Sequence, residues 1–337
     1  MCGLSDYAGE VVNWAGTHLH VVSGKGGAGK TTVAAALAIN LARNGRRTLL
    51  MEVEGRQGIA QLFDTPPLPY EERRIAIAPG DGEVWALAVD ADEALVDYLA
   101  TFYNLGRAGS AMRRMGAIDF ATTLAPGLRD VLLTGKACEV VRRKIKRTEN
   151  AYDAVVIDAP PTGRIAQFLN VTAQVSALAR TGPIHRHAEM VMGVIGSPQT
   201  AVHLVTLLEE MPVQETLDGI AELKKADLPV GAVFVNMTRA PIFDDKQRAR
   251  IRKGTLPKHK IGETAHAAGI RQPAGVIASS LIQEAQDHVQ RTDLEARELE
   301  RIAALELPTF TLPYLMRGID LGGLYALADA LHAEGIQ

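Results

Sequence analysis

The residues best suited to chemistry form one glycine-rich segment, Gly24-Lys25-Gly26-Gly27-Ala28-Gly29-Lys30-Thr31-Thr32. It satisfies the GxxxxGK[ST] pattern of a phosphate-binding loop. Its glycines let successive backbone N–H groups turn inward around phosphate groups, a conformation that side chains would obstruct. Lys30 is placed to reach the terminal phosphates, and the Thr31 hydroxyl to ligate Mg²⁺. We therefore expect a nucleotide site formed by Gly24, Gly26, Gly27, Ala28, Gly29, Lys30, Thr31 and Thr32.

A carboxylate that can serve the metal follows the apolar run 154–157. Asp158 comes at the end of this run, an arrangement that places a carboxylate near Mg²⁺ and its waters. The next five residues, 159–163, are Ala-Pro-Pro-Thr-Gly, a rigid turn that can respond to the γ-phosphate. The alternative is that Asp158 only starts a turn or caps the next helix. We favour the role at the metal, which makes Thr31 and Asp158 the expected metal ligands.

A second carboxylate should orient the water that attacks the γ-phosphate. Glu54 is the candidate, because it stands where an expected second strand ends and the chain turns towards the nucleotide. Glu52 would share a strand face with Glu54 if the strand ran straight through both. Both glutamates could also be solvated surface carboxylates. The residues alone thus give Lys30, Glu54 and Asp158 as the expected catalytic groups.

The elements around these residues must position them. After the loop, Val33, Leu37 and Leu41 recur four apart, which predicts a helix whose positive N-terminal end points at the anion. Elsewhere short apolar runs alternate with helical patterns, which is typical of a parallel sheet covered by helices on both faces. The expected strands are 18–22, 47–53, 84–89, 154–157, 201–207, 230–235 and 309–312.

Two strand-poor stretches interrupt this alternation, at 90–147 and 163–198. The chain is therefore expected to be an α/β protein, a P-loop NTPase with a mostly parallel, doubly wound sheet and an inserted α-helical subdomain. We expect one domain over residues 1–337, with the helical subdomain inserted at approximately 90–147 and 163–198. Residues 283–305, dense in Glu, Gln and Arg, predict a solvated surface helix.

Composition limits the remaining classes. The 337 residues carry a formal net charge of -3, and the sequence pI is about 6.3, which gives no general attraction to nucleic acid or to acidic lipid. Two cysteines cannot support a disulfide framework or a four-thiolate metal site from one chain. The first 16 residues lack a basic start followed by an apolar core, and no apolar run approaches the length of a membrane span. We expect a cytoplasmic protein without a membrane span.

At this point the motifs resemble a known family. The loop Gly24–Thr32 is similar to the deviant Walker A motif of ATPases that include nitrogenase iron protein, MinD, ParA and ArsA. The turn 158–163 is close to the switch II motif of the ArsA group, which comprises arsenical-pump ATPases and the ATPases that target tail-anchored membrane proteins. Three downstream segments also resemble this group: 209–216 after the fifth strand, 233–236 with its adenine-reading asparagine, and the adenine loop 312–318. The chain as a whole suggests a bacterial, actinobacterial member.

The resemblance implies an ATP-hydrolysing dimer that uses ATP/ADP and Mg²⁺. In it, Lys25 of one subunit reaches the phosphates bound by the other, so that ATP binding closes the dimer and hydrolysis opens it. Asn236, Pro313 and Tyr314 would hold adenine. The partner would be a second copy or a paralogous subunit, and the helical insertions would handle a protein or hydrophobic client.

The chain also departs from the family pattern. Glu54 stands where the family has aspartate, and its extra methylene can displace the attacking water, so that hydrolysis is slow or needs a partner. No CxxC pair is present, and Cys2 with Cys138 cannot reproduce the arsenical-pump metalloid site. Two other readings therefore stay open: a nucleotide-locked scaffold with weak or vestigial ATPase activity, and a MinD/ParA-like partitioning ATPase.

Several smaller features have structural explanations that compete with functional ones. Cys138 suits a small buried residue of a helix. The pair His185 and His187 and the basic run 142–147 suit solvated surfaces, although metal binding or docking is open for them. Leu324, Leu327 and Leu331 predict a helix that packs on the sheet. Core packing and client binding explain equally well the methionines Met112, Met115, Met190 and Met192.

Overall fold

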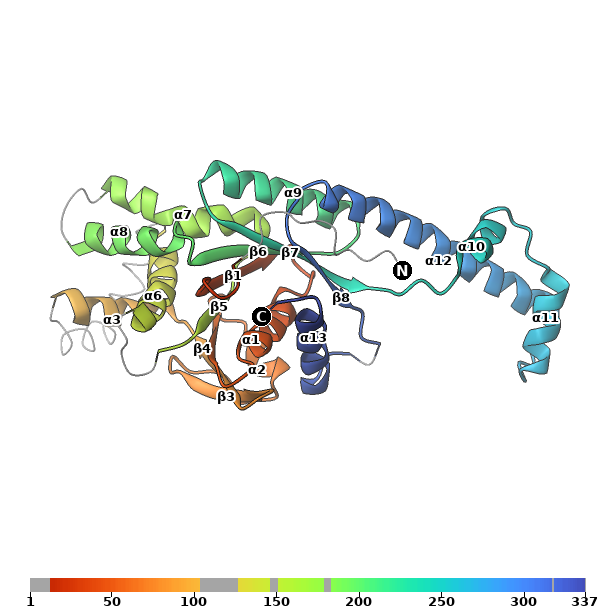
Figure 1. The fold of residues 1–337 in the computed structure, drawn as a ribbon, viewed down its shortest axis with the longest axis horizontal. Helices are drawn as coiled ribbons and strands as arrows, with labels where there is room; N and C mark the ends of the chain where they lie inside the picture. The colour runs from red at the N-terminus through yellow and green to blue at the C-terminus, as the bar shows by residue number, and fades with distance from the viewer. Residues whose placement is uncertain (1–12, 104–126, 146–150, 179–182, 317, 337) are drawn as a thin grey trace.

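The computed structural model describes residues 13–103, 127–145, 151–178, 183–316 and 318–336 (Figure 1). Eight strands form one sheet in the order β3-β4-β2-β5-β1-β6-β7-β8. Every neighbouring pair is parallel except β3 and β4, which are antiparallel. The strands are β1 (Leu19–Gly24), β2 (Arg47–Glu52), β3 (Arg73–Ala78), β4 (Gly82–Ala88), β5 (Ala154–Asp158), β6 (Thr200–Thr206), β7 (Val230–Thr238) and β8 (Thr309–Pro313).

The mostly parallel α/β sheet expected from the sequence is confirmed, and each of the seven expected strands is present within a few residues of its expected bounds. Strand β3 was not expected. It is an edge strand joined to β4 by a tight turn, in which Gly80 and Asp81 both have positive φ (76° and 58°). That backbone conformation is typical of two-residue hairpin turns, so the Pro79-Gly80-Asp81-Gly82 run was the overlooked signal.

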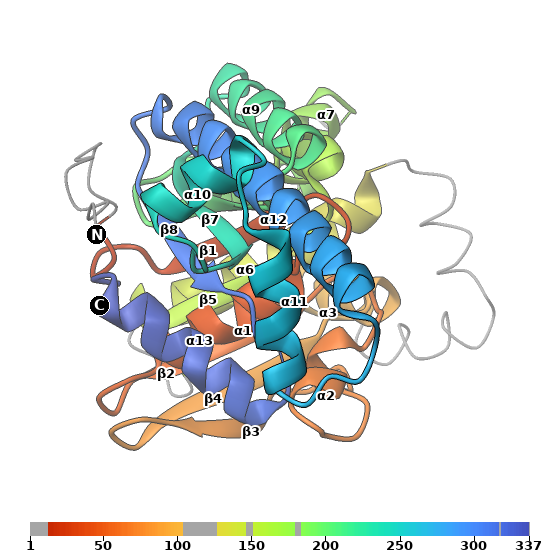
Figure 2. The ribbon, with the colours of Figure 1, turned by 90° about the vertical axis from the view of Figure 1, so that its right-hand side faces the viewer.

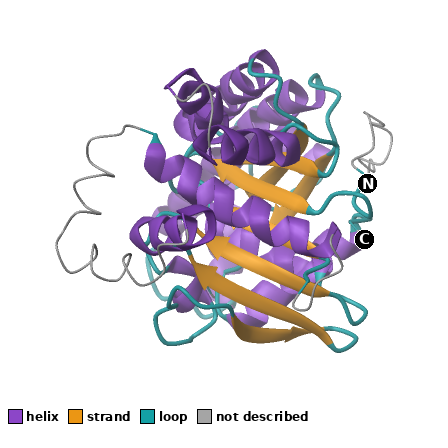
Figure 3. Cartoon of the chain, turned by 90° about the vertical axis from the view of Figure 1, so that its left-hand side faces the viewer, coloured by secondary structure: helices purple, strands orange, loops and turns teal. Residues whose placement is uncertain are grey.

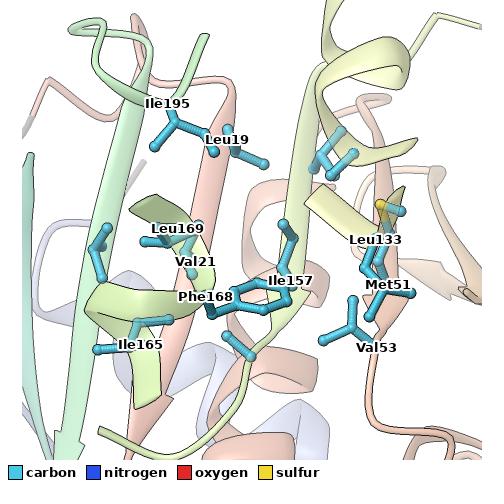
Figure 4. Close-up of a cluster of buried hydrophobic side chains, with 14 of the residues drawn as sticks. Leu19, Val21, Met51, Val53, Leu133, Ile157, Ile165, Phe168, Leu169 and Ile195 are labelled. Carbon is cyan, nitrogen blue, oxygen red and sulfur yellow. The ribbon is translucent and has the colours of Figure 1, made fainter. Parts of the chain in front are cut away.

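Helices cover both faces of the sheet (Figure 3). One face carries α6, α7, α8 and α9, and the other carries α1 and α13. Figure 4 shows Val21, Met51 and Ile157 from three neighbouring strands meeting Phe168 of α7 and Leu133 of α6. The described helices are α1 (Lys30–Leu41), α2 (Gly58–Leu62), α3 (Ala91–Tyr103), α6 (Leu128–Ile145), α7 (Thr162–Leu178), α8 (Pro183–Ile195), α9 (Glu210–Lys225), α10 (Asp245–Arg252), α11 (Lys258–Ala267), α12 (Ala274–Ala303) and α13 (Leu321–Ala333).

The smaller sequence features mostly have structural roles. Cys138 is fully buried in α6, and burial raises the pKa of its thiol to about 12. In the basic run, Arg143 pairs with Glu72 and Glu139. The C-terminal leucines of α13 are buried against α1 and β8, as predicted. Met112 and Met115 lie outside the described residues, and Met190 packs partly buried against the core.

A buried histidine pair lies under the α1–α13 face. Nδ1 of His20 on β1 is 3.0 Å from Nε2 of His203 on β6, and the Ala232 N–H donates to Nδ1 of His203 over 3.0 Å. Trp14 stacks on both imidazoles, with ring centroids 5.6 and 5.3 Å away. Because Nδ1 of His203 accepts, its proton is on Nε2 and is donated to His20. Burial lowers the pKa of His20 to about 3 and the pKa of His203 well below its ordinary value, so both rings are neutral.

The last notable element is an arm formed by α10, α11 and the first half of α12, which extends beyond the end of the sheet (Figures 1 and 2). The expected surface helix at 283–305 is only the second part of α12, which begins at Ala274. Within the described residues, no helix is both long enough and apolar enough to cross a membrane.

Candidate functional site

The glycine-rich loop leaves the carboxyl end of β1, the central strand of the order given above, and leads into α1. Gly24 has φ of 155°, and a Cβ there would collide with the carbonyl oxygen of Val205 on β6. Gly27 and Gly29 both have φ of 86°, in the left-handed region that favours glycine. A Cβ built on Gly26 or Gly27 would meet no atom within 4 Å. The loop thus presents its backbone to open space, as an anion cradle requires.

The described part of the chain brings the expected metal ligands together beside this cradle. The Thr31 hydroxyl in the first turn of α1 donates to Oδ2 of Asp158 at the end of β5, over 2.6 Å. The other carboxylate oxygen, Oδ1, is buried and has no hydrogen-bond partner among the described residues. Lys30 is also buried, with 9% of its surface exposed. A hydroxyl and an unpaired carboxylate oxygen fit Mg²⁺, which prefers oxygen ligands.

The surroundings of Asp158 disfavour the charged form of its carboxyl group. Burial raises the pKa of its carboxyl to about 6, helped by the like charges of Glu52 and Glu54. The Thr31 hydrogen bond and the Lys30 ammonium oppose that rise without cancelling it. A buried carboxylate with an elevated pKa binds a divalent cation readily, because the cation supplies the charge that solvent no longer offers.

The two glutamates after β2 have different environments. Glu52 is only 2% exposed, and its carboxylate accepts the backbone N–H groups of Gln57 and Ile59, the latter over 3.2 Å. It therefore holds the loop that leads into α2. Glu54 lies beyond the end of β2, partly exposed, with Oε2 3.6 Å from a guanidinium nitrogen of Arg56. The negative charge of Glu54 contributes to the raised pKa of the Asp158 carboxyl.

Asn236 connects the loop to the other half of the sheet. It lies in β7, is 5% exposed, and its amide donates to the carbonyl oxygen of Ala28 over 2.8 Å. Asn236 also lines a cavity of about 380 Å³ between the ends of β6 and β7 and helix α12, with Leu207, Arg239 and Leu294 among its walls.

The other expected adenine residues lie at the end of β8. Pro313 closes β8, and the next N–H, of Tyr314, donates to the carbonyl oxygen of Thr238 over 2.8 Å. Neither Pro313 nor Tyr314 lines the cavity beside Asn236. The guanidinium of Arg239 lies 4.6 Å from the Tyr314 ring centroid and so links the two regions.

Two contacts of the site were not expected from the sequence. Nζ of Lys25 lies 2.9 Å from Oε1 of Glu215 on α9 of the same chain, and both side chains are about one-third exposed (32% and 39%). The Ser23 hydroxyl donates over 2.6 Å to the carbonyl oxygen of Pro160, which ties β1 to the turn after Asp158. A hydroxyl directly before the glycine-rich loop was the available signal for the second contact.

Comparison with known proteins gives the family. The model of the ArsA family, described as anion-transporting ATPases, matches residues 17–197, more than half of the chain. The chain belongs to this family. It is 49% identical to ATPase BagA of Mycobacterium tuberculosis over all of both chains. It is 29% identical to ATPase GET3 of Chaetomium globosum over 58% of this chain and 55% of that protein. The arsenical pump-driving ATPase of Acidiphilium multivorum is 23% identical, over 90% of this chain and 52% of its own.

No group of three or more His, Cys, Asp or Glu side chains that could hold a metal occurs in the described ranges. His185 instead lies 3.3 Å from Glu189, one turn along α8.

Proposed function

We propose that this ArsA-family protein hydrolyses ATP at the loop Gly24–Thr32 with Mg²⁺, and that nucleotide state controls its association with a partner. The observation that carries this proposal is the Thr31–Asp158 hydrogen bond, whose carboxylate keeps one buried oxygen unpaired beside Lys30. A hydroxyl, a carboxylate and an ammonium are the groups with which P-loop ATPases hold the metal and the phosphates. Bound Mg²⁺ supplies charge neutralisation at the β- and γ-phosphate oxygens.

The chain's own residues then have separate tasks. Lys30 binds the terminal phosphates, and Thr31 and Asp158 hold the metal. Asn236, Pro313 and Tyr314 hold the adenine. Glu54 orients the attacking water, but its pairing with Arg56 and its long side chain support slow turnover that a partner accelerates.

Steady-state phosphate release tests the proposal. Lys30→Ala and Asp158→Asn should each lower kcat at least about a hundredfold, the scale of losing one preorganised charge in a catalytic site. The matched control is Asp64→Asn, which changes an exposed carboxylate with positive φ, a conformation that asparagine accepts. If both site variants kept wild-type turnover, the proposal would be refuted.

The Glu54–Arg56 pair also favours a second candidate, a nucleotide-locked scaffold with vestigial turnover. A single-turnover measurement with purified protein and excess enzyme over ATP separates the two candidates. Complete hydrolysis without a partner would contradict the scaffold. ATP that stays intact over hours while the protein remains assembled would contradict the ATPase.

We further propose that the protein works as a dimer, of itself or with a paralogous subunit, in which Lys25 serves the neighbour's phosphates. Mixing Lys25→Ala with Lys30→Ala tests this for the homodimer. If Lys25 acts across the interface, half of the dimers in an equal mixture contain one complete site, and about a quarter of wild-type turnover returns. Action within one subunit would give no recovery.

Client handling rests on the helical stretches 90–147 and 163–198, which we propose form a subdomain inserted into the single domain of residues 1–337. Helices α3, α6, α7 and α8 from these stretches pack on one another. Their partly buried Met190 and Met192 suit an apolar protein client. Crosslinking of a photoreactive apolar peptide at position 192, dependent on nucleotide, would support this role, and equal labelling of unfolded protein would contradict it.

A further inference from the structure

The arm of α10, α11 and the first half of α12 is firmly packed on its inner side. Arg248 and Arg252 of α10 both pair with Asp293 of α12, the first over 2.9 Å, and Ile251 between them is buried. Gly262 of α11 lies so close to α12 that a Cβ there would be 2.7 Å from the carbonyl oxygen of Ala274. The arm is therefore a fixed projection with a defined outer surface (Figure 2).

That outer surface is strongly basic. Residues 246–271 contain eight lysines and arginines and one glutamate, a net charge of +7 in a chain whose net charge is -3. Lys246 and Arg250 on α10 and its C-cap Lys253 recur at helical spacing, on the side away from the residues that contact α12. Six exposed cations have no ion pair with any described residue: Lys246, Arg250, Lys253, Lys258, Lys260 and Arg271. Like charges held this close repel one another unless an anionic partner covers them.

Aliphatic side chains are exposed on the part of the arm that also carries Lys258, Lys260 and Arg271. Ile270, Val276 and Leu281 have 44%, 57% and 41% of their surfaces exposed, at the junction of α11 and α12 and in the first turns of α12. Beyond them the exposed face of α12 becomes acidic at Glu284 and Asp287. The unpaired cations and these aliphatic residues thus all fall within residues 246–281, which we name the arm tip.

We propose that the arm tip docks peripherally on an anionic phospholipid surface. Lysines and arginines around exposed aliphatic residues match the headgroup layer, where the cations meet lipid phosphates and the aliphatic groups enter the acyl boundary. Nucleic acid fits less well, because the arm tip contains no Phe, Tyr or Trp on which bases could stack. This docking is independent of ATP turnover.

Co-sedimentation of the full-length protein with vesicles tests the proposal. Vesicles of phosphatidylglycerol and phosphatidylcholine in equal parts should bind the protein, and pure phosphatidylcholine should not. Lys258→Gln with Lys260→Gln should lower the partition coefficient about 25-fold, at about fivefold for each cation near the surface. Its matched control changes two exposed lysines outside the arm, Lys224→Gln with Lys225→Gln, and should bind like wild type.

A second variant separates lipid from other anionic partners. Ile270→Ser with Val276→Ser keeps every charge and should weaken vesicle binding, most visibly at high salt, where the electrostatic part is screened. Equal vesicle binding by wild type and Lys258→Gln/Lys260→Gln would overturn the proposal. The proposal would also be overturned if the protein bound an oligonucleotide more tightly than vesicles and the serine variant bound it equally well. The same holds if wild type did not bind vesicles and the Lys258→Gln/Lys260→Gln variant lost its oligomeric state.

Discussion

The buried histidine pair makes a quantitative prediction about acid stability. His20 and His203 are neutral in the folded protein, with the pKa of His20 lowered to about 3 and that of His203 also well below its ordinary value. In the unfolded chain each imidazole titrates near pH 6.5. The unfolded state therefore takes up protons first as the pH falls, and the stability present above pH 6.5 is lost progressively towards pH 3.

The size of this loss follows from the linkage relation. Between pH 7 and pH 5, His20 contributes about 2 kcal/mol of destabilisation, and His203 adds to that loss in the same direction. That is a large part of the 5–15 kcal/mol by which typical domains are stable. Urea denaturation across this pH range, followed by the fluorescence of the protein's two tryptophans, measures the effect.

Comparison of variants isolates the pair from other titrating groups. His20→Phe keeps a ring for Trp14 to stack on and removes one site. The slope of unfolding free energy against pH below 6.5 should therefore fall by about 1.4 kcal/mol per pH unit. His259→Gln is the control, because that side chain is 88% exposed. An unchanged slope in His20→Phe would refute the buried, neutral assignment.

Three further predictions concern the site. Glu215→Gln removes the ion pair of Lys25 and so frees Lys25 for the neighbouring subunit. Because exposed ion pairs are worth about 0–1 kcal/mol, the dissociation constant of the dimer formed with a non-hydrolysable ATP analogue should fall up to about fivefold in sedimentation experiments. Weaker dimerisation would contradict this. Gly29→Ala places a Cβ against the amide of Asn236 at positive φ, and should weaken ADP binding at least about tenfold in calorimetry. Because the pKa of Asp158 is raised to about 6, its ionised fraction falls from about nine-tenths at pH 7 to about one-tenth at pH 5. The affinity for Mg²⁺ should therefore fall about tenfold between these pH values. Asp158→Asn should lack this pH dependence.

The sequence predicted the parts of the site that depend on local order. A glycine-rich run after a strand, and an aspartate that ends another strand, keep their relation to the sheet in any doubly wound fold. The functions of Glu52 and Glu54 were harder to separate, since where the strand ends decides which side chain turns inward. The Lys25–Glu215 contact needs α9 to approach the loop from 190 residues away, which no local pattern reveals.

The edge strand and the arm were missed for other reasons. Strand β3 has a short apolar alternation after two arginines, too weak to distinguish it from a loop. The arm is built of polar helices whose few buried residues, such as Ile251 and Ala265, give no continuous apolar stripe. Its spacing of basic residues was visible in the sequence, but the sequence does not show which of them are exposed and unpaired on the arm.

The register of the sheet has a consequence for how nucleotide state is transmitted. Glu52 and Asp158 are Cα partners in the β2–β5 ladder, so the two loops that follow these strands leave the sheet from the same rung. The Glu52 carboxylate accepts the backbone N–H of Ile59 beyond the first loop, and the Ser23 hydroxyl donates to the carbonyl oxygen of Pro160 in the second. Hydrogen bonds therefore hold both loops to strands of the same sheet. A displacement of one loop should therefore move the rung that it shares with the other loop.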